Sequence, residues 1–215
     1  MNDKEILEFV IPYTLCSDER ILNVLDLIDV VAKKKIPGDF VEIGVFQGGI
    51  IMAMALKLKQ LGLDRKIYAY DTFTGMTPPT EDDRNLHDFP AILYVDPKSP
   101  LYSENTVCQC PLGVVMENVK QTQYSNIVFC KGDILHTDIQ TIPTQIALLR
   151  LDTDWHESTK FELRHFEPNV VSGGFVIIDD YGHWLGARKA VNEFLETHPQ
   201  TLYQIDYTGI FWRKP

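Results

Sequence analysis

The 215-residue sequence predicts an α/β fold in which parallel strands alternate with helices. Three observations support this prediction. Short apolar segments that resemble buried strands recur along the chain, segments with helical periodicity separate them, and an acidic residue follows most of the strands. Because a parallel sheet brings the carboxyl ends of its strands to one edge, we expect those acids to meet there.

The first third of the chain alternates helix and strand. Residues 1–36 are expected to form an N-terminal helical segment, in which Ser17 begins a helix that ends in three lysines, Lys33 to Lys35. The predicted elements that follow are a strand, a helix and a strand, at residues 40–43, 50–61 and 66–70. This order is the βαβ unit of a parallel sheet.

Residues 72–111 interrupt the pattern, because prolines alternate there with acids and isolated aromatic residues. A segment of this length inside a compact domain usually has a function of its own. It follows directly on the second strand, which places it over the carboxyl edge of the sheet. We interpret it as a mobile substrate lid, and an inert surface insertion is the alternative.

The rest of the chain predicts three more strands and a closing hairpin. The expected strands are residues 127–129, 146–151 and 175–178, the expected helices are 107–121, 156–166 and 185–198, and the hairpin joins 201–206 to 210–213. A chain of this length fits one domain with a sizeable core, so we assign residues 1–215 to a single domain.

The composition excludes several classes of function. A net charge of −10 argues against a nucleic-acid partner, since phosphate neutralisation needs a basic surface. No run approaches the roughly 20 apolar residues of a membrane span, and residues 1–10 lack the apolar core of a signal peptide. We therefore expect a cytoplasmic protein with no membrane partner. The four cysteines are expected to be reduced thiols, because the Cys108-Gln-Cys110 spacing is too short for a structural zinc site.

The loop after the first strand predicts a site for a nucleoside ligand. Residues 42–49, Glu-Ile-Gly-Val-Phe-Gln-Gly-Gly, allow the backbone to pass close to a ligand and then open a helix with free N–H groups. The spacing matches neither the dinucleotide motif nor the P-loop. Glu42 would repel a pyrophosphate and suits a cationic amine, such as that of S-adenosylmethionine. Asp71 is placed to hold ribose hydroxyls and Asp133 the adenine amino group.

Asp152, Asp179 and Asp180 follow the fourth and fifth strands and predict a metal site. Three carboxylates without a paired histidine or cysteine favour a hard, oxygen-binding ion, Mg²⁺ before Mn²⁺ or Ca²⁺. A capped turn is the alternative explanation of the Asp179-Asp180 pair.

Several blocks of the sequence resemble the macrocin O-methyltransferase family, whose members methylate sugar hydroxyls of natural products. The blocks are residues 41–45, 71–76, 149–154 with 157–159, and 173–182, and the helix at 187–194 is also similar. The resemblance implies a Rossmann-like class I methyltransferase fold with a seven-stranded, mostly parallel sheet of order 3-2-1-4-5-7-6 and helices on both faces. It also implies Mg²⁺ at Asp152, Asp179 and Asp180, a general base at Asp154, and dimers or larger homo-oligomers.

From these observations we expect a methyl transfer from S-adenosylmethionine to a hydroxyl of a small molecule, most directly a sugar or a glycosylated natural product. The metal would lower the pKa of the hydroxyl, and Asp154 would take its proton. The expected cofactor-binding residues are Glu42, Gly44, Val45, Phe46, Gly48, Gly49, Asp71, Thr72, Phe73, Gly132, Asp133 and Asp152. The expected acceptor contacts are Trp155, His156, Tyr181, His183 and Arg188, with Trp184 as a further wall residue and the two histidines as alternative bases.

Other functions stay open on the sequence alone. A catechol-like or other small-molecule O-methyltransferase would use the same metal chemistry. A non-catalytic nucleoside- or metal-binding protein would use the same residues without turnover, and a metal-dependent hydrolase would need only the acids. The acid at Glu42 and the missing third glycine count against a nicotinamide-dependent dehydrogenase.

Overall fold

The computed structural model describes residues 1–138 and 140–215 in full and Ile139 by its backbone alone. One sheet contains seven strands in the order β3-β2-β1-β4-β5-β7-β6, which confirms the predicted order. The strands are β1 (Asp39–Ile43), β2 (Ile67–Asp71), β3 (Ile127–Lys131), β4 (Ile146–Leu151), β5 (Val170–Ile178), β6 (Tyr203–Gln204) and β7 (Ile210–Arg213). The first five pair in parallel, and β7 is antiparallel to both β5 and β6.

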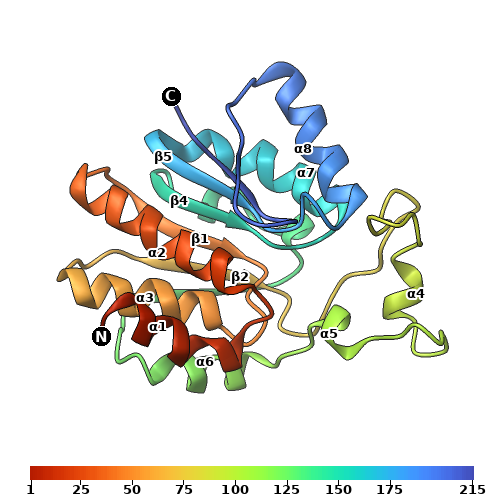
Figure 1. The fold of residues 1–215 in the computed structure, drawn as a ribbon, viewed down its shortest axis with the longest axis horizontal. Coiled ribbons are helices and arrows are strands. Elements are labelled where there is room, and N and C mark those ends of the chain that lie inside the picture. The colour runs from red at the N-terminus through yellow and green to blue at the C-terminus, as the bar shows by residue number, and fades with distance from the viewer.

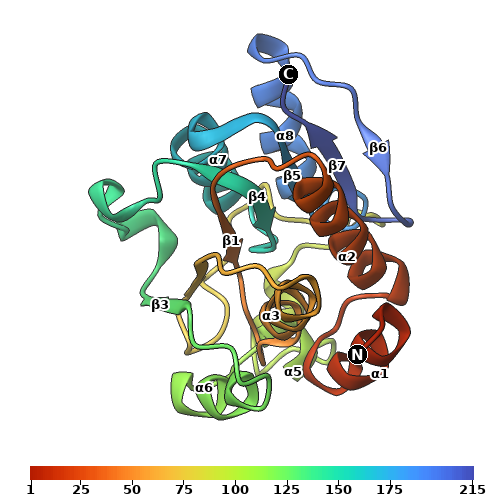
Figure 2. The same ribbon diagram turned by 90° about the vertical axis from the view of Figure 1, so that its left-hand side faces the viewer.

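Helices cover both faces of the sheet (Figures 1 and 2). On one face lie α1 (Asp3–Val10), α2 (Asp18–Lys33), α3 (Gly49–Leu61) and α6 (Leu112–Lys120), and on the other α7 (His156–His165) and α8 (Leu185–Thr197). Two short helices, α4 (Ile92–Val95) and α5 (Glu104–Val107), and four 3₁₀ turns, at Ile11–Tyr13, Ile134–His136, Ile139–Thr141 and Glu167–Asn169, complete the structure. No helix in the described chain has the length and apolar content to span a membrane.

The central strand β4 is buried along its whole length. Leu148 packs into the core on the face of α2 and α3, and Leu149 packs into the core on the face of α7 and α8. Burial of each such side chain contributes about 1.5–3 kcal/mol. The same strand carries Arg150, which is 1% exposed. A charge in this position must be paired with other buried groups, because an isolated buried charge is strongly destabilising.

Two elements, β5 and α6, begin five residues away from their predicted starts. Strand β5 begins at Val170, five residues before the predicted start at residue 175, because Gly173 and Gly174 lie inside the strand. A Cβ on Gly174 would lie 2.9 Å from the Val171 carbonyl oxygen, so this glycine marks close packing and not a turn. Helix α6 begins after Pro111, whereas the sequence predicted a start at residue 107. The residues before a proline disfavour the helical conformation, and residues 104–107 form the separate helix α5.

The segment 72–111 projects from the body of the molecule (Figure 1). It is attached to that body through Asp83 and Asn85. Asp83 is 0% exposed, and its carboxylate accepts hydrogen bonds from the backbone N–H groups of His156 (2.7 Å) and Thr80 (2.6 Å). Asn85 forms a β-bridge with Trp184, next to the start of α8. The segment is therefore attached at the N-terminal ends of α7 and α8, and its role as a lid stays a prediction.

We expect Asp83→Ala to lower the free energy of unfolding by about 2–3 kcal/mol, because two backbone N–H groups lose their acceptor in a buried position. Urea denaturation followed by circular dichroism measures this change. Glu81→Ala is the matched control, since Glu81 is an exposed acid of the same segment, and its effect should stay within about 0.5 kcal/mol. Equal stability of the two variants would show that Asp83 does not anchor the segment.

Candidate active site

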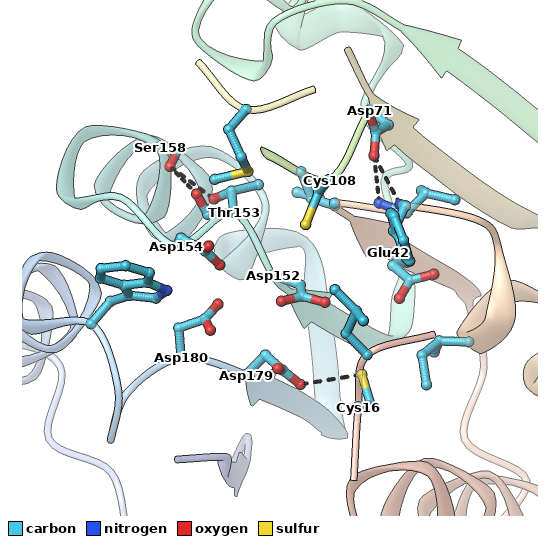
Figure 3. Close-up of a pocket in the computed structure, with 18 of the residues that line it drawn as sticks. Cys16, Glu42, Asp71, Cys108, Asp152, Thr153, Asp154, Ser158, Asp179 and Asp180 are labelled. Atoms are coloured by element: carbon cyan, nitrogen blue, oxygen red, sulfur yellow. Dashed lines mark hydrogen bonds between the residues drawn. The ribbon is translucent and has the colours of Figure 1, made fainter. Parts of the chain in front are cut away.

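A cavity of about 440 Å³ opens at the carboxyl ends of the parallel strands (Figure 3). The acids that the sequence placed after the strands all line it. They are Glu42 at the end of β1, Asp71 after β2, Asp133 after β3, Asp152 and Asp154 after β4, and Asp179 and Asp180 after β5. Both ends of the segment 72–111 also reach the wall, through Met76 and Cys108 among others.

The loop between β1 and α3 is held by Asp71. One oxygen of its carboxylate accepts hydrogen bonds from the backbone N–H groups of Val45 (2.7 Å) and Phe46 (3.2 Å), and the other accepts one from Phe73 (2.6 Å). Gly44 has a φ of +86°, and a Cβ there would lie 1.9 Å from the Asp152 carbonyl oxygen. Only glycine fits this position, where the loop crosses the end of β4. A carboxylate has about four lone-pair sites, so Asp71 can still accept from a ligand.

Among the acids of the cavity Glu42 is the most deeply buried, with 1% of its surface exposed. Its Oε1 atom accepts a hydrogen bond from Arg150 at 2.7 Å, and its Oε2 atom has no partner among the described residues. Burial raises the pKa of Glu42 to about 8, although Arg150 opposes the rise. An unpaired buried acceptor costs about 1–3 kcal/mol, so the site fits a ligand that brings a cationic donor.

Arg150 connects the acids of the site by hydrogen bonds, and it was not among the site residues expected from the sequence. Its Nη1 atom donates to Glu42 and to Asp152, both at 2.7 Å, and its Nη2 atom donates to Asp179 and to the sulfur of Cys16. Arg20 of α2 also pairs with Asp179. The signal for Arg150 was present in the sequence, since a single charge inside the apolar stretch 146–151 must find buried partners.

The carboxylates after β4 and β5 form two groups that share Asp152. Asp152, Asp154 and Asp180 each offer an oxygen within 4.8 Å of the others, and Asp179 lies in the second group beside Cys16 (Figure 3). Asp154 reaches the same edge because its backbone has a φ of +67°, which turns the chain off the strand. Oxygen ligands in this number fit a hard divalent ion, which would also relieve their mutual repulsion.

Burial makes the carboxyl groups of Asp154 and Asp180 difficult to ionise. It raises the pKa of Asp154 to about 7, with the nearby Asp152 and Asp179 adding to the rise. It raises the pKa of Asp180 well above its ordinary value, with Asp154 as the next largest cause. Such a cluster of acids is stabilised in its ionised form by a cation, because opposite charge lowers the pKa of a buried carboxyl.

Not every expected cofactor residue reaches the cavity. The wall includes Glu42, Gly44, Val45, Phe46, Asp71, Thr72, Gly132, Asp133 and Asp152. Gly48, Gly49 and Phe73 lie behind it. A Cβ on Gly49 would meet the Tyr13 backbone at 2.8 Å, so this glycine allows close packing of the N-terminal segment. These three residues support the loops around the cavity and do not form part of the cavity wall.

Most of the expected acceptor contacts lie elsewhere. His183 lines the cavity together with Trp184, whereas Trp155, His156, Tyr181 and Arg188 do not. His156 is held by Glu157 and Glu193, and Arg188 donates to the backbone carbonyls of Tyr181 and Gly182. The indole of Trp155 donates to the Thr77 carbonyl, which packs this side chain against the segment 72–111.

Many wall residues were not expected from the sequence, among them two cysteines and a tyrosine. Cys16 and Cys108 approach Asp152 from opposite sides of the cavity (Figure 3), and Tyr207 lies beside His183 with its hydroxyl 3.4 Å from the imidazole. All four cysteines are free thiols, as expected. Cys16 and Tyr207 come from opposite ends of the chain, so no local pattern could have placed them at this site.

The strand order, the glycine loop after β1 and the acids after β1 and β2 define the chain as a class I S-adenosylmethionine-dependent methyltransferase. Comparison with protein families narrows this class to one family, because residues 10–214 match the model of macrocin-O-methyltransferase (TylF). The chain belongs to this family and is an O-methyltransferase.

Curated relatives agree with this assignment. The chain is 32% identical over 209 residues to 8-demethyl-8-(2,3-dimethoxy-alpha-L-rhamnosyl)-tetracenomycin-C 4'-O-methyltransferase of Streptomyces olivaceus, covering 94% of this chain and 76% of the relative. It is 29% identical over 218 residues to demethyldecarbamoylnovobiocin O-methyltransferase of Streptomyces niveus, covering 94% and 76%. Among solved structures, the O-methyltransferase NovP superposes with a TM-score of 0.81 at 28% identity, covering 94% of this chain and 82% of NovP.

Proposed function

We propose that the chain transfers a methyl group from S-adenosylmethionine to a sugar hydroxyl of a glycosylated natural product, with the help of Mg²⁺. The observation that carries the proposal is the meeting of two features in one cavity, namely the unpaired Oε2 atom of Glu42 and the carboxylate group of Asp152, Asp154 and Asp180. The names of the relatives support the acceptor class, since one acts on a rhamnosyl tetracenomycin and another on mycinamicin III.

The β1 side of the cavity would bind the methyl donor. The ammonium group of S-adenosylmethionine would pair with Glu42, which has a free and buried oxygen. Asp71 would accept from the ribose hydroxyls, and Asp133 would accept from the adenine amino group. The backbone from Gly44 to Phe46 would lie against the ligand, because Asp71 fixes this loop.

The β4 and β5 side of the cavity would bind the metal and the acceptor. Asp152 and Asp180 would hold Mg²⁺, with Asp179 completing the set through lone pairs that its arginine partners leave free. A bound divalent ion lowers the pKa of a hydroxyl and fixes its direction. Asp154 would take the proton from that hydroxyl, and residues of the segment 72–111 such as Met76 would exclude water.

The direct test is incubation of the protein with S-adenosylmethionine, Mg²⁺ and a panel of acceptors, followed by mass spectrometry of the products. We expect one added methyl group on a rhamnosylated polyketide or macrolide and none on its aglycone. Methylation of catechol but of no glycoside would contradict the acceptor class. Binding of S-adenosylhomocysteine without any turnover would support the non-catalytic alternative.

We expect Glu42→Gln to weaken the affinity for S-adenosylhomocysteine about 10- to 30-fold, because the neutral amide cannot form an ion pair with the ammonium group. Isothermal titration calorimetry measures the dissociation constant. Glu167→Gln is the matched control, since Glu167 is also buried and paired with a lysine but lies outside the cavity. An unchanged affinity in Glu42→Gln would remove Glu42 from the cofactor site.

A further inference from the structure

The cavity has a cofactor end, which is its β1 side, and a metal end, which is its β4 and β5 side. Among the described residues, Arg150 is the one side chain that contacts carboxylates at both ends. At the cofactor end it pairs with Glu42, and at the metal end it pairs with Asp152 and Asp179. A single guanidinium group therefore lies between the group that would bind the methyl donor and the groups that would bind the ion.

The two terminal nitrogens of Arg150 are saturated by these contacts. Each terminal nitrogen carries two hydrogens, and both nitrogens have two acceptors, Glu42 and Asp152 for Nη1 and Asp179 and Cys16 for Nη2. Its contacts use Oε1 of Glu42 and leave Oε2 unpaired. Arg150 thus determines which oxygen of Glu42 points to a ligand.

The sheet fixes where this guanidinium lies. In the register of the parallel strands, Arg150 of β4 stands beside Glu42 of β1 on one side and Ile177 of β5 on the other. With 1% of its surface exposed, Arg150 is placed by the backbone of three neighbouring strands and not by solvent. An arginine suits this position because its planar group binds several carboxylates in fixed directions, which a lysine cannot do.

We propose that Arg150 is a positioning residue that holds the cofactor carboxylate and the metal carboxylates as one rigid unit, and so sets the methyl donor against the bound hydroxyl. The proposal rests on the proposed function. Arg150 acts through Glu42, Asp152 and Asp179 and contacts neither ligand itself. Arg20 offers an internal comparison, because it also pairs with Asp179 but its second partner is Asp206, away from Glu42.

The test compares Arg150→Lys with Arg20→Lys, two substitutions that keep the charge and lose the forked geometry. Calorimetry measures the affinity for S-adenosylhomocysteine, and electron paramagnetic resonance of Mn²⁺ measures the affinity for the ion. We expect Arg150→Lys to weaken both affinities about tenfold or more. We expect Arg20→Lys to weaken Mn²⁺ alone and to leave S-adenosylhomocysteine within about twofold.

A second measurement needs no substitution at Arg150 and covers the case in which that variant does not fold. The guanidinium N–H signals of Arg150 in the unmodified protein, assigned as those that persist when each of the other six arginines is replaced by lysine in turn, should shift when S-adenosylhomocysteine is added and again when Mg²⁺ is added.

Loss of only one affinity in Arg150→Lys, or a signal that responds to only one ligand, overturns the proposal. If the unmodified protein binds no divalent ion at all, the metal-assisted mechanism is wrong, and so is the part of this proposal that concerns the metal carboxylates. A normal affinity for S-adenosylhomocysteine in Arg150→Lys would overturn the proposal for Arg150 and leave the methyltransferase assignment intact.

Discussion

Removal of divalent ions by excess chelator is expected to lower the rate of methyl transfer about 1,000-fold or more, equivalent to about 4 kcal/mol of transition-state stabilisation. A sugar hydroxyl is a weak nucleophile, and the ion would make it more acidic and direct it towards the methyl group. The affinity for S-adenosylhomocysteine should stay within about threefold, because Glu42 and Asp71 lie at the cofactor end of the cavity.

The measurement is the initial rate with chelator, and then after addition of Mg²⁺ or Mn²⁺ in excess. Asp180→Ala should show the same loss without recovery, because Asp180 belongs to the carboxylate group that would hold the ion. Lys98→Ala, a change at an exposed residue of segment 72–111, is the control and should behave as the unmodified protein. Full activity in chelator would remove metal assistance from the mechanism.

Asp154→Asn should lower kcat by about 100- to 10,000-fold, the usual contribution of a general base. The amide keeps the size of the side chain and cannot accept the proton. Asp154 is placed for this role beside Asp180 and Asp152, on the turn that follows β4. Single-turnover kinetics, with an acceptor that the panel assay shows to be methylated, measures the chemical step alone.

The same variant separates two roles for Asp154. As a base, Asp154→Asn leaves the Mn²⁺ affinity close to that of the unmodified protein, and added ion does not restore the rate. As a metal ligand, it weakens Mn²⁺ binding, and excess ion restores most of the rate. The second result would place Asp154 in the metal site, in keeping with its position in one group with Asp152 and Asp180.

The parts of the fold that local sequence patterns describe were predictable. Buried parallel strands such as β4 are continuous apolar runs, and an acid after each strand falls at the same edge of the sheet in any α/β fold. The same rule predicts that Glu42, Asp71 and Asp152 meet at one edge, and all three line the cavity. The sequence predicted that the glycines of the first loop allow the backbone to pass close to a ligand, whereas the close approach that the structure shows at Gly44 is to the end of β4.

What could not be predicted depends on contacts between distant parts of the chain. The partners of Arg150 come from β1, β5 and the N-terminal segment, and no spacing in the sequence connects them. The orientation of a side chain on a turn is equally hidden. Trp155 and His156 follow Asp154 directly, yet they point away from the cavity, because Thr77 and Glu193 provide their hydrogen-bond partners.

Arg20, near the start of the chain, pairs with Asp206 as well as Asp179, and the hydroxyl of Thr208 donates to the Asp179 carbonyl at 3.0 Å. The surroundings of Asp179 are therefore complete only when residues from both ends of the sequence have come together. During synthesis on a ribosome, Arg20 emerges long before its partners, and contacts of such high sequence separation form late. A chain truncated after β5 would lack the contacts that Asp206 and Thr208 make around Arg20 and Asp179, so we expect it to have no competent metal end even where its parallel strands have formed.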